Sequence, residues 1–367
     1  MPKFIPGLQL CEGFYVDAVE PILARVYPEL RYSAGLIGPG SEVLGLDTET
    51  STDHGWGPRV QLFVDKETHR TLRKDVQKTL ADNLPYTYKG YSTSFQDADP
   101  EAGPVTHMVP KISGPVDHMI EVLVPREYSK RQLGADATKS LSATDWLAIS
   151  QHHLLTMTSG KLFRDDLDVA AMRKNLEYFP RDHWIFLMGC CWWRMRRWEQ
   201  QIGRAGQMED ELSAKLLAAK IVQDLMRLAF LMERKYIPYT KWQGAVFRKL
   251  DCGPELGPHL DAMLAATGWL DRDRALVNSL ETVARMHNDL RVTPRMNDKC
   301  VLFPMRTYHH MDCDVFGRTL FGQVMSKPLS NLFRQGVPGS IDIIIDSMDM
   351  HVSSITHGKV RKLFKVD

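Results

Sequence analysis

Long apolar runs are scarce in this chain of 367 residues. The longest nearly apolar run, Trp184 to Trp193, has ten residues, whereas a membrane-spanning helix needs roughly 20. The first residues, MPKFIPGLQL, lack the charged and then apolar pattern of a secretory signal, and Pro6 and Gly7 interrupt them. We therefore expect a protein without a membrane partner that works in the cytoplasm.

Cysteine and net charge are also low. The six cysteines are scattered and form no CxxC pair, which disfavours a disulfide scaffold or a structural zinc site. Forty-six Lys and Arg against forty-five Asp and Glu leave a formal charge of +1, so no global field attracts nucleic acid. The basic and aromatic run CCWWRMRRW, residues 190–198, is more typical of a helix with one core face than of a base-stacking surface.

Hydrophobic patterning predicts an α/β protein in two parts, a mixed β-sheet domain over residues 1–138 and an all-helical domain over 139–367 that ends in a short extension. The first part contains a predicted helix and two predicted strands. In the second part, apolar residues recur at helical spacing in three segments. The tail from Ile341 to Ile345 has a short β-like run. The predicted segments are the helices Phe14–Val26, Asp182–Gln201, Glu209–Lys235 and one through Leu276–Leu290, and the strands Arg59–Val64 and Met119–Val124.

The strongest functional signal is the segment from Gly38 to Val64, GPGSEVLGLDTETSTDHGWGPRVQLFV. Small residues such as Gly40 and Ser41 let backbone N–H groups approach phosphate oxygens, and a serine hydroxyl adds a donor. Asp53 follows after a spacer of eleven residues and just before a strand, where a carboxylate could hold Mg²⁺ against those phosphates. No Gly-Lys-Ser/Thr closes the loop, so a Walker-type NTPase is disfavoured.

This spacing resembles the fingerprint of the nucleotidyltransferase superfamily. The strings GSEVLGLDTETSTDHGWGPRVQLF, SGKLFRDDL, GRAGQMEDEL and AKIVQDLMRLAFLMERKYIPYTKW, in this order, further resemble domain-of-unknown-function family 4037 over roughly residues 10 to 350. That resemblance implies a nucleotidyltransferase-like domain followed by a helical region. It also implies Mg²⁺-dependent transfer of a nucleoside monophosphate from ATP or another NTP to a hydroxyl or amine of a small-molecule acceptor.

The resemblance also suggests roles for individual residues. Asp53 matches a metal ligand, Glu121 matches a carboxylate that binds metal or takes the acceptor's proton, and Lys241 matches a lysine that neutralises the triphosphate. Arg59 follows a Gly-Pro turn, where a guanidinium could hold phosphate oxygens in a bidentate manner or could be a structural ion-pair partner. His54 could act as a metal ligand or proton acceptor near neutral pH.

One residue departs from the pattern, because the superfamily places a second carboxylate where this chain has Gly55. Carboxylates two apart on a strand share a face and can share metal ions. Three interpretations stay open: a weakened one-metal enzyme, a site rebuilt with Asp47 or Glu49, or a scaffold whose adenylyl chemistry is lost or replaced. The last would be a nucleotide- or metabolite-binding protein, or a biosynthetic enzyme with non-nucleotidyl chemistry through His54.

Several other polar residues are better explained by structure than by catalysis. Asp165 and Asp166 suit the start of a helix. Glu209, which could join Arg204 in an acceptor pocket, is also explained by a helix dipole. His287 falls on the apolar stripe of its helix and is expected to be buried and hydrogen-bonded. No motif in the chain identifies the acceptor, the nucleotide or the oligomeric state.

Overall fold

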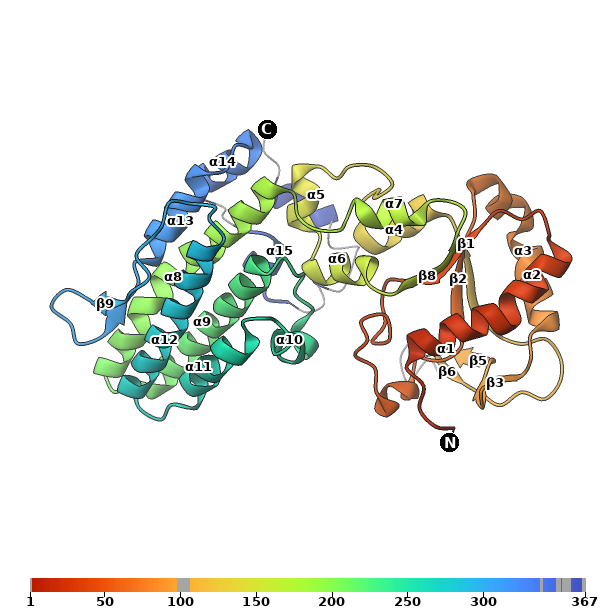
Figure 1. Cartoon of the computed structure of the whole chain (residues 1–367), viewed down its shortest axis with the longest axis horizontal. Coiled ribbons are helices and arrows are strands. Elements are labelled where there is room, and N and C mark those ends of the chain that lie inside the picture. Colours follow the sequence, from red (N-terminus) through yellow and green to blue (C-terminus); the bar gives the residue numbers. More distant parts are fainter. Residues whose placement is uncertain (1, 98–105, 337–338, 348–350, 352–357, 365–367) are drawn as a thin grey trace. The chain divides into compact units, whose positions relative to one another are not determined.

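The computed structural model describes residues 2–97, 106–336, 339–347, 351 and 358–364. The chain divides into two compact units, the first formed by residues 1–141 and 153–177 and the second by residues 142–152 and 178–367 (Figure 1). The predicted architecture, a mixed β-sheet region followed by a helical region, is confirmed. None of the helices among the described residues is both long and apolar enough to cross a membrane.

The first unit is built on a four-stranded mixed sheet with the strand order β7-β2-β1-β8. Strand β1 is antiparallel to both β2 and β8, and β2 is parallel to β7. Its helices and strands are α1 (Gly7–Phe14), the π-helical turn η1 (Tyr15–Val19), α2 (Glu20–Val26), β1 (Ser33–Leu36), the 3₁₀ turn η2 (Glu49–Asp53), β2 (Arg59–Phe63), α3 (Lys66–Asn83), β3 (Thr87–Tyr88), β4 (Tyr91–Ser92), β5 (Phe95–Asp97), β6 (Thr106–Met108), β7 (Met119–Leu123), α4 (Pro125–Leu133), most of α6 (Gln151–Thr158), β8 (Lys161–Asp165) and α7 (Val169–Lys174).

The two faces of this sheet differ. Val60, Leu62, Ile120 and Val122 point to one face, where they join the core residues of α1, α2 and α3. Because side chains alternate along a strand, Arg59, Gln61 and Glu121 point to the other face, toward α4. Arg59 and Glu121, two of the residues predicted for the site, therefore share the face that the main core does not use.

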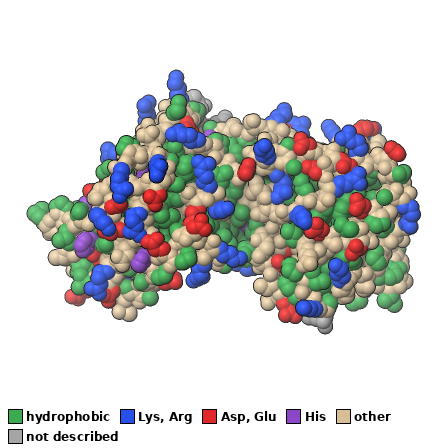
Figure 2. Space-filling view, in the orientation of Figure 1, with side chains coloured by type: hydrophobic (Ala, Val, Ile, Leu, Met, Phe, Trp, Pro, Cys, Tyr) green, Lys and Arg blue, Asp and Glu red, His purple; other side chains and the backbone are tan. Residues whose placement is uncertain are grey.

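The second unit is helical. Helix α8 packs against α9 and α13, and α12 packs against α9 and α11. On the face drawn in Figure 2, acidic and basic side chains both occur over the surface, as the net charge of +1 leads one to expect. The helices and strands of this unit are α5 (Ala143–Ala148), α8 (Arg181–Gln207), α9 (Glu211–Met232), α10 (Thr240–Phe247), α11 (Gly253–Ala265), α12 (Trp269–Asp289), β9 (Val301–Leu302), β10 (His309–His310), α13 (Cys313–Gly322), α14 (Lys327–Arg334), α15 (Ile341–Ile344) and η4 (Arg361–Phe364).

Two predictions from the sequence need correction. The run Ile341–Ile345 is not a strand, since Ile341–Ile344 form the short helix α15, and a run this short carries no periodicity that separates helix from strand. The helix predicted from Phe14 begins earlier, because α1, η1 and α2 follow one another from Gly7 to Val26.

The chain passes between the two units after residues 141, 152 and 177, whereas the sequence placed one boundary between residues 138 and 139. Residues 153–177 return to the first unit because β8 pairs with β1 and so becomes an edge of its sheet. Between the two predicted strands, β2 and β7, the chain forms α3 and the short strands β3, β4, β5 and β6, while residues 98–105 lie outside the described residues.

Candidate functional site

The loop after β1 brings its backbone unusually close to two side chains of the polar sheet face. Gly38 and Gly40 have φ angles of +89° and +150°, in the region that favours glycine. A Cβ at Gly38 would lie 2.1 Å from the hydroxyl of Tyr128, and one at Gly40 would lie 2.7 Å from Nη2 of Arg59. Both glycines are therefore required by the packing of this face, whatever ligand it binds.

Arg59 is the basic group at the start of β2. Its guanidinium forms an ion pair with the carboxylate of Glu42, which is 2% exposed, and Nη2 also donates to the carbonyl oxygen of Pro39 at 3.4 Å. Burial acts against the charged form of Arg59, but Glu42, Cys11 and Tyr128 together outweigh it, and the pKa of the guanidinium is raised. Arg59 thus lies against the glycine loop and is paired with Glu42, a counter-charge that no sequence motif identified.

Glu121 lies in register with Gln61 across the parallel pair β2 and β7. Its half-exposed side chain forms an ion pair with Arg131 of α4 at 3.1 Å. The guanidinium carbon of Arg131 is 5.2 Å from the ring centroid of Tyr128. Glu121 is therefore accessible from solvent, and its charge is balanced by an arginine at the surface.

Tyr128 connects these groups. Its hydroxyl donates to the carbonyl oxygen of Ile37 at 2.7 Å and accepts from Nε2 of Gln61 at 3.0 Å. Burial raises the pKa of this phenol, so it stays a neutral donor at physiological pH. We call the set formed by the 38–42 loop, Arg59, Gln61, Glu121, Tyr128 and Arg131 the sheet-face cluster.

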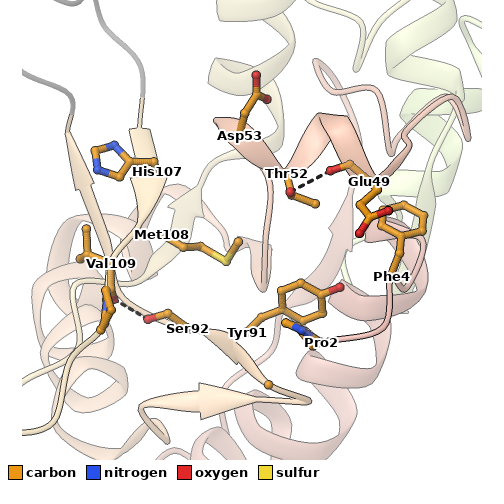
Figure 3. A pocket seen from close by; sticks show the side chains of 12 residues that line it. Pro2, Phe4, Glu49, Thr52, Asp53, Tyr91, Ser92, His107, Met108 and Val109 are labelled. Atoms are coloured by element: carbon orange, nitrogen blue, oxygen red, sulfur yellow. Dashed lines mark hydrogen bonds between the residues drawn. The ribbon is translucent and has the colours of Figure 1, made fainter.

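Asp53 does not belong to this cluster. Gly55 and Gly57, with φ angles of +61° and +141°, interrupt the extended chain before β2, and Asp53 ends the preceding turn η2 instead. Its carboxylate is 61% exposed and lies 2.9 Å from Nδ1 of His54. Asp53 lines a pocket of about 480 Å³ whose wall includes neither Arg59 nor Glu121 (Figure 3).

The two carboxylates that might rebuild the site lie in different surroundings. Asp47 accepts hydrogen bonds from the backbone N–H of Gly7 at 2.7 Å and from the indole of Trp56 at 3.0 Å, so it fixes the start of α1. Glu49 lines the same pocket as Asp53. Of the two, Glu49 is thus the carboxylate that accompanies Asp53.

The carboxylates and imidazoles of the described residues do not gather into a metal site. Among the described residues, no group of three or more His, Cys, Asp or Glu side chains is arranged to hold a metal ion. Mg²⁺ prefers six oxygen ligands in nearly octahedral geometry. The predicted pair of Asp53 and Glu121 does not supply such a set.

Lys241 belongs to the second unit, where it lies in the first turn of α10. Its ammonium group is 5.4 Å from the ring centroid of Trp242. The role that the resemblance implies for Lys241 stays a prediction.

Asp165 and His287, for which a structural role was expected, have one, whereas Glu209 precedes α9 and Asp166 pairs with Arg164. Asp165 accepts hydrogen bonds from the backbone N–H groups of Val169 and Ala170 at the start of α7. His287 is buried and lies 2.9 Å from the hydroxyl of Thr293.

In the run 190–198, Trp192 is fully buried. Arg194 forms an ion pair with the buried Asp224 at 3.2 Å. An arginine of this run therefore stabilises the helical core.

Taken together, the first unit is a mixed-sheet α/β domain with a glycine loop and an arginine on one sheet face. Residues 146–243 match the model of a family described as domain of unknown function DUF4037, which confirms the predicted resemblance over this part of the chain. The matched stretch is shorter than the residues 10 to 350 over which the motifs suggested a likeness. No curated protein matches the chain significantly.

Among solved structures, a nucleotidyltransferase-like protein from Exiguobacterium sibiricum 255-15 is similar to this chain. The two sequences are 11% identical, and the alignment covers 87% of this chain and 91% of the other with a TM-score of 0.30.

Proposed function

We propose that the sheet-face cluster binds the phosphates of a nucleoside triphosphate and that the protein transfers the nucleoside monophosphate to a hydroxyl or amine of a small molecule. One observation carries this proposal. Arg59 lies against Gly40 on the sheet face that also presents Glu121, so a phosphate-binding group and an accessible carboxylate share one surface.

Each residue has a defined task in this proposal. The guanidinium of Arg59 binds phosphate oxygens and neutralises the charge that develops on them, and the hydroxyl of Ser41 donates to the same group. The acceptor oxygen or nitrogen forms a bond to the α-phosphorus, while the bond to the bridging oxygen breaks and pyrophosphate leaves with the electron pair. Glu121 takes the proton of the acceptor.

The remaining predicted residues are assigned by resemblance alone. The resemblance implies that a Mg²⁺ ion would accompany the triphosphate and offset its charge, and Asp53 is the carboxylate that would hold that ion. Lys241 is proposed to neutralise the triphosphate, and His54 is a second candidate for the proton acceptor. None of these three belongs to the sheet-face cluster.

The test measures nucleotide binding and pyrophosphate release with purified protein, Mg²⁺, labelled NTPs and small-molecule extracts. We expect Ser41→Ala to weaken nucleotide binding and Glu121→Gln to lower turnover by about 10²-fold, the usual contribution of a general base. Glu67→Gln is the matched control, since Glu67 is an exposed carboxylate paired with Arg70 on α3. Absence of both nucleotide binding and pyrophosphate release in the parent protein would contradict the proposal.

A second function, a nucleotide- or metabolite-binding protein without transfer chemistry, is supported by a different observation. Arg59 is neutralised by Glu42, Glu121 is neutralised by Arg131, and Gly55 replaces the second carboxylate. Gly55→Asp separates the two functions. Metal and nucleotide affinity that appear only in the variant would indicate a degenerate binding protein, whereas unchanged turnover would indicate a site built from other ligands.

A further inference from the structure

The pocket beside η2 lies in the first unit and is separate from the sheet-face cluster. Its volume of about 480 Å³ is within the range of small-molecule sites. In Figure 3, Glu49, Thr52 and Asp53 border it on the η2 side, and His107, Met108 and Val109 border it on the side of β6. The pocket thus combines a polar edge with an apolar edge.

The charge at the polar edge is negative. Glu49 and Asp53 contribute two carboxylates, and none of the described residues that line the pocket is a lysine or an arginine. Lys111, which follows the lining residue Pro110 in the chain, forms an ion pair with Asp117 at 2.7 Å. A phosphate or carboxylate ligand would therefore meet repulsion here, whereas a cation would be attracted.

Aromatic rings form another part of the wall. Phe4 and Tyr91 both line the pocket, and both pack on the buried Trp56, with ring centroids 5.9 Å and 5.1 Å from the indole. Trp56 in turn donates its indole N–H to Asp47 at 3.0 Å, and this hydrogen bond fixes the ring against which Phe4 and Tyr91 pack. Rings held in this way offer both apolar contact and attraction for a cation over their faces.

We propose that this pocket binds an organic cation, a protonated amine with an aromatic or aliphatic body. The ammonium group pairs with Glu49, and the body contacts Phe4, Tyr91 and Met108. A polyhydroxylated sugar would leave the apolar wall without a partner, and an anion would lack a counter-charge. This inference does not depend on nucleotidyl transfer, because the binding needs no nucleotide.

The experiment compares three probes of one shape by NMR titration or calorimetry without nucleotide: phenethylamine, 2-phenylethanol and 3-phenylpropionate. We expect the amine to bind about 10-fold more tightly than the alcohol and the carboxylate to show no binding. Glu49→Gln should weaken amine binding 3- to 10-fold and leave alcohol binding unchanged. Thr52 donates to the backbone carbonyl of Glu49, not to its side chain, so this substitution keeps η2 intact.

Glu67→Gln on α3 is the matched control and should leave all three affinities unchanged. Equal binding of amine and alcohol, binding of the carboxylate, an unaffected amine affinity in Glu49→Gln, or no binding of any probe would each overturn the proposal. Loss of NTP turnover with intact amine binding would instead count only against the proposed transfer reaction. A Phe4→Leu variant adds a second readout, since it should weaken binding of the amine and the alcohol together.

Discussion

Removing the carboxylate of Glu42 tests whether Arg59 is a phosphate-binding group that Glu42 positions, or a residue with a purely structural role. In Glu42→Gln the guanidinium of Arg59 keeps its place beside Gly40 but loses its counter-charge, and Nη2 keeps the carbonyl oxygen of Pro39 as a hydrogen-bond partner. Breaking a buried ion pair on one side costs roughly 3–5 kcal/mol. Because the Arg59 side chain is 16% exposed, we expect the lower end, about 3 kcal/mol.

Pyrophosphate should restore part of the free energy of unfolding that Glu42→Gln loses. Pyrophosphate that binds the uncompensated guanidinium stabilises the folded protein by about 2.7 kcal/mol when its concentration is 100 times the Kd. In the parent protein pyrophosphate must compete with Glu42, so the gain there should be smaller. We therefore expect pyrophosphate to stabilise Glu42→Gln more than the parent.

Hydrogen exchange of the β2 amides is the suitable assay, because it reports on the first unit separately from the helical unit. Exchange is measured with and without pyrophosphate for the parent, Glu42→Gln and the control Glu67→Gln. The reasoning would be refuted by a cost below about 1 kcal/mol in Glu42→Gln, which would mean that the ion pair is solvated. Equal stabilisation of all three proteins by pyrophosphate would refute the assignment of Arg59 as a phosphate-binding group.

Three further substitutions have defined outcomes. Gly55→Asp should lower the free energy of unfolding by only about 1 kcal/mol in chemical denaturation. A Cβ at this position meets open space, and Asp is among the residues that best tolerate a φ of +61°. A loss of several kcal/mol would disagree with that geometry. Tyr128→Phe should destabilise the first unit by about 1–2 kcal/mol, because the hydroxyl bridges Ile37 and Gln61 inside the protein, and exchange of the β2 amides would register this. Burial lowers the pKa of His287 to about 4. Above pH 6.5 the imidazole is therefore neutral in both the folded and the unfolded protein. As the pH falls from 6.5 to 4, the imidazole of the unfolded chain is protonated first, and the second unit loses stability. That loss amounts to about 3 kcal/mol for this residue. His287→Leu should remove it from the pH dependence of unfolding, and an unchanged dependence would show that the pKa of His287 is the same in the folded and the unfolded protein.

The sequence predicted the elements whose patterns are strong. Strand β7 shows a clear alternation of side chains, and the helices α9 and α12 carry apolar residues at helical spacing. Strand β1, with the sequence SAGL, has no such signal, because Ser, Ala and Gly are poor strand formers. It is a strand because β2 and β8 pair with it from both sides, and pairing between distant segments is not visible in a local pattern.

The candidate site was predictable to a similar extent. Parallel pairing of two predicted strands was enough to bring Arg59 and Glu121 to one face, since alternation fixes their direction. The counter-charge of Glu42 and the hydroxyl of Tyr128 depend on how a loop and α4 pack over that face. The departure of Asp53 depends on the backbone angles of Gly55 and Gly57, which a spacing rule does not contain.

The glycine loop illustrates why the motif alone cannot decide the function. Gly38 and Gly40 are what a phosphate-binding loop requires, but the contacts of Tyr128 and Arg59 already exclude any larger side chain at both positions. A substitution of either glycine would therefore disturb the fold under both functions and distinguish neither. Ser41 carries a side chain that is absent from these steric contacts, so its replacement by alanine removes a donor without a clash. For this reason Ser41 and the Glu42 carboxylate, rather than the glycines, are the positions at which a transferase and a structural scaffold predict different results.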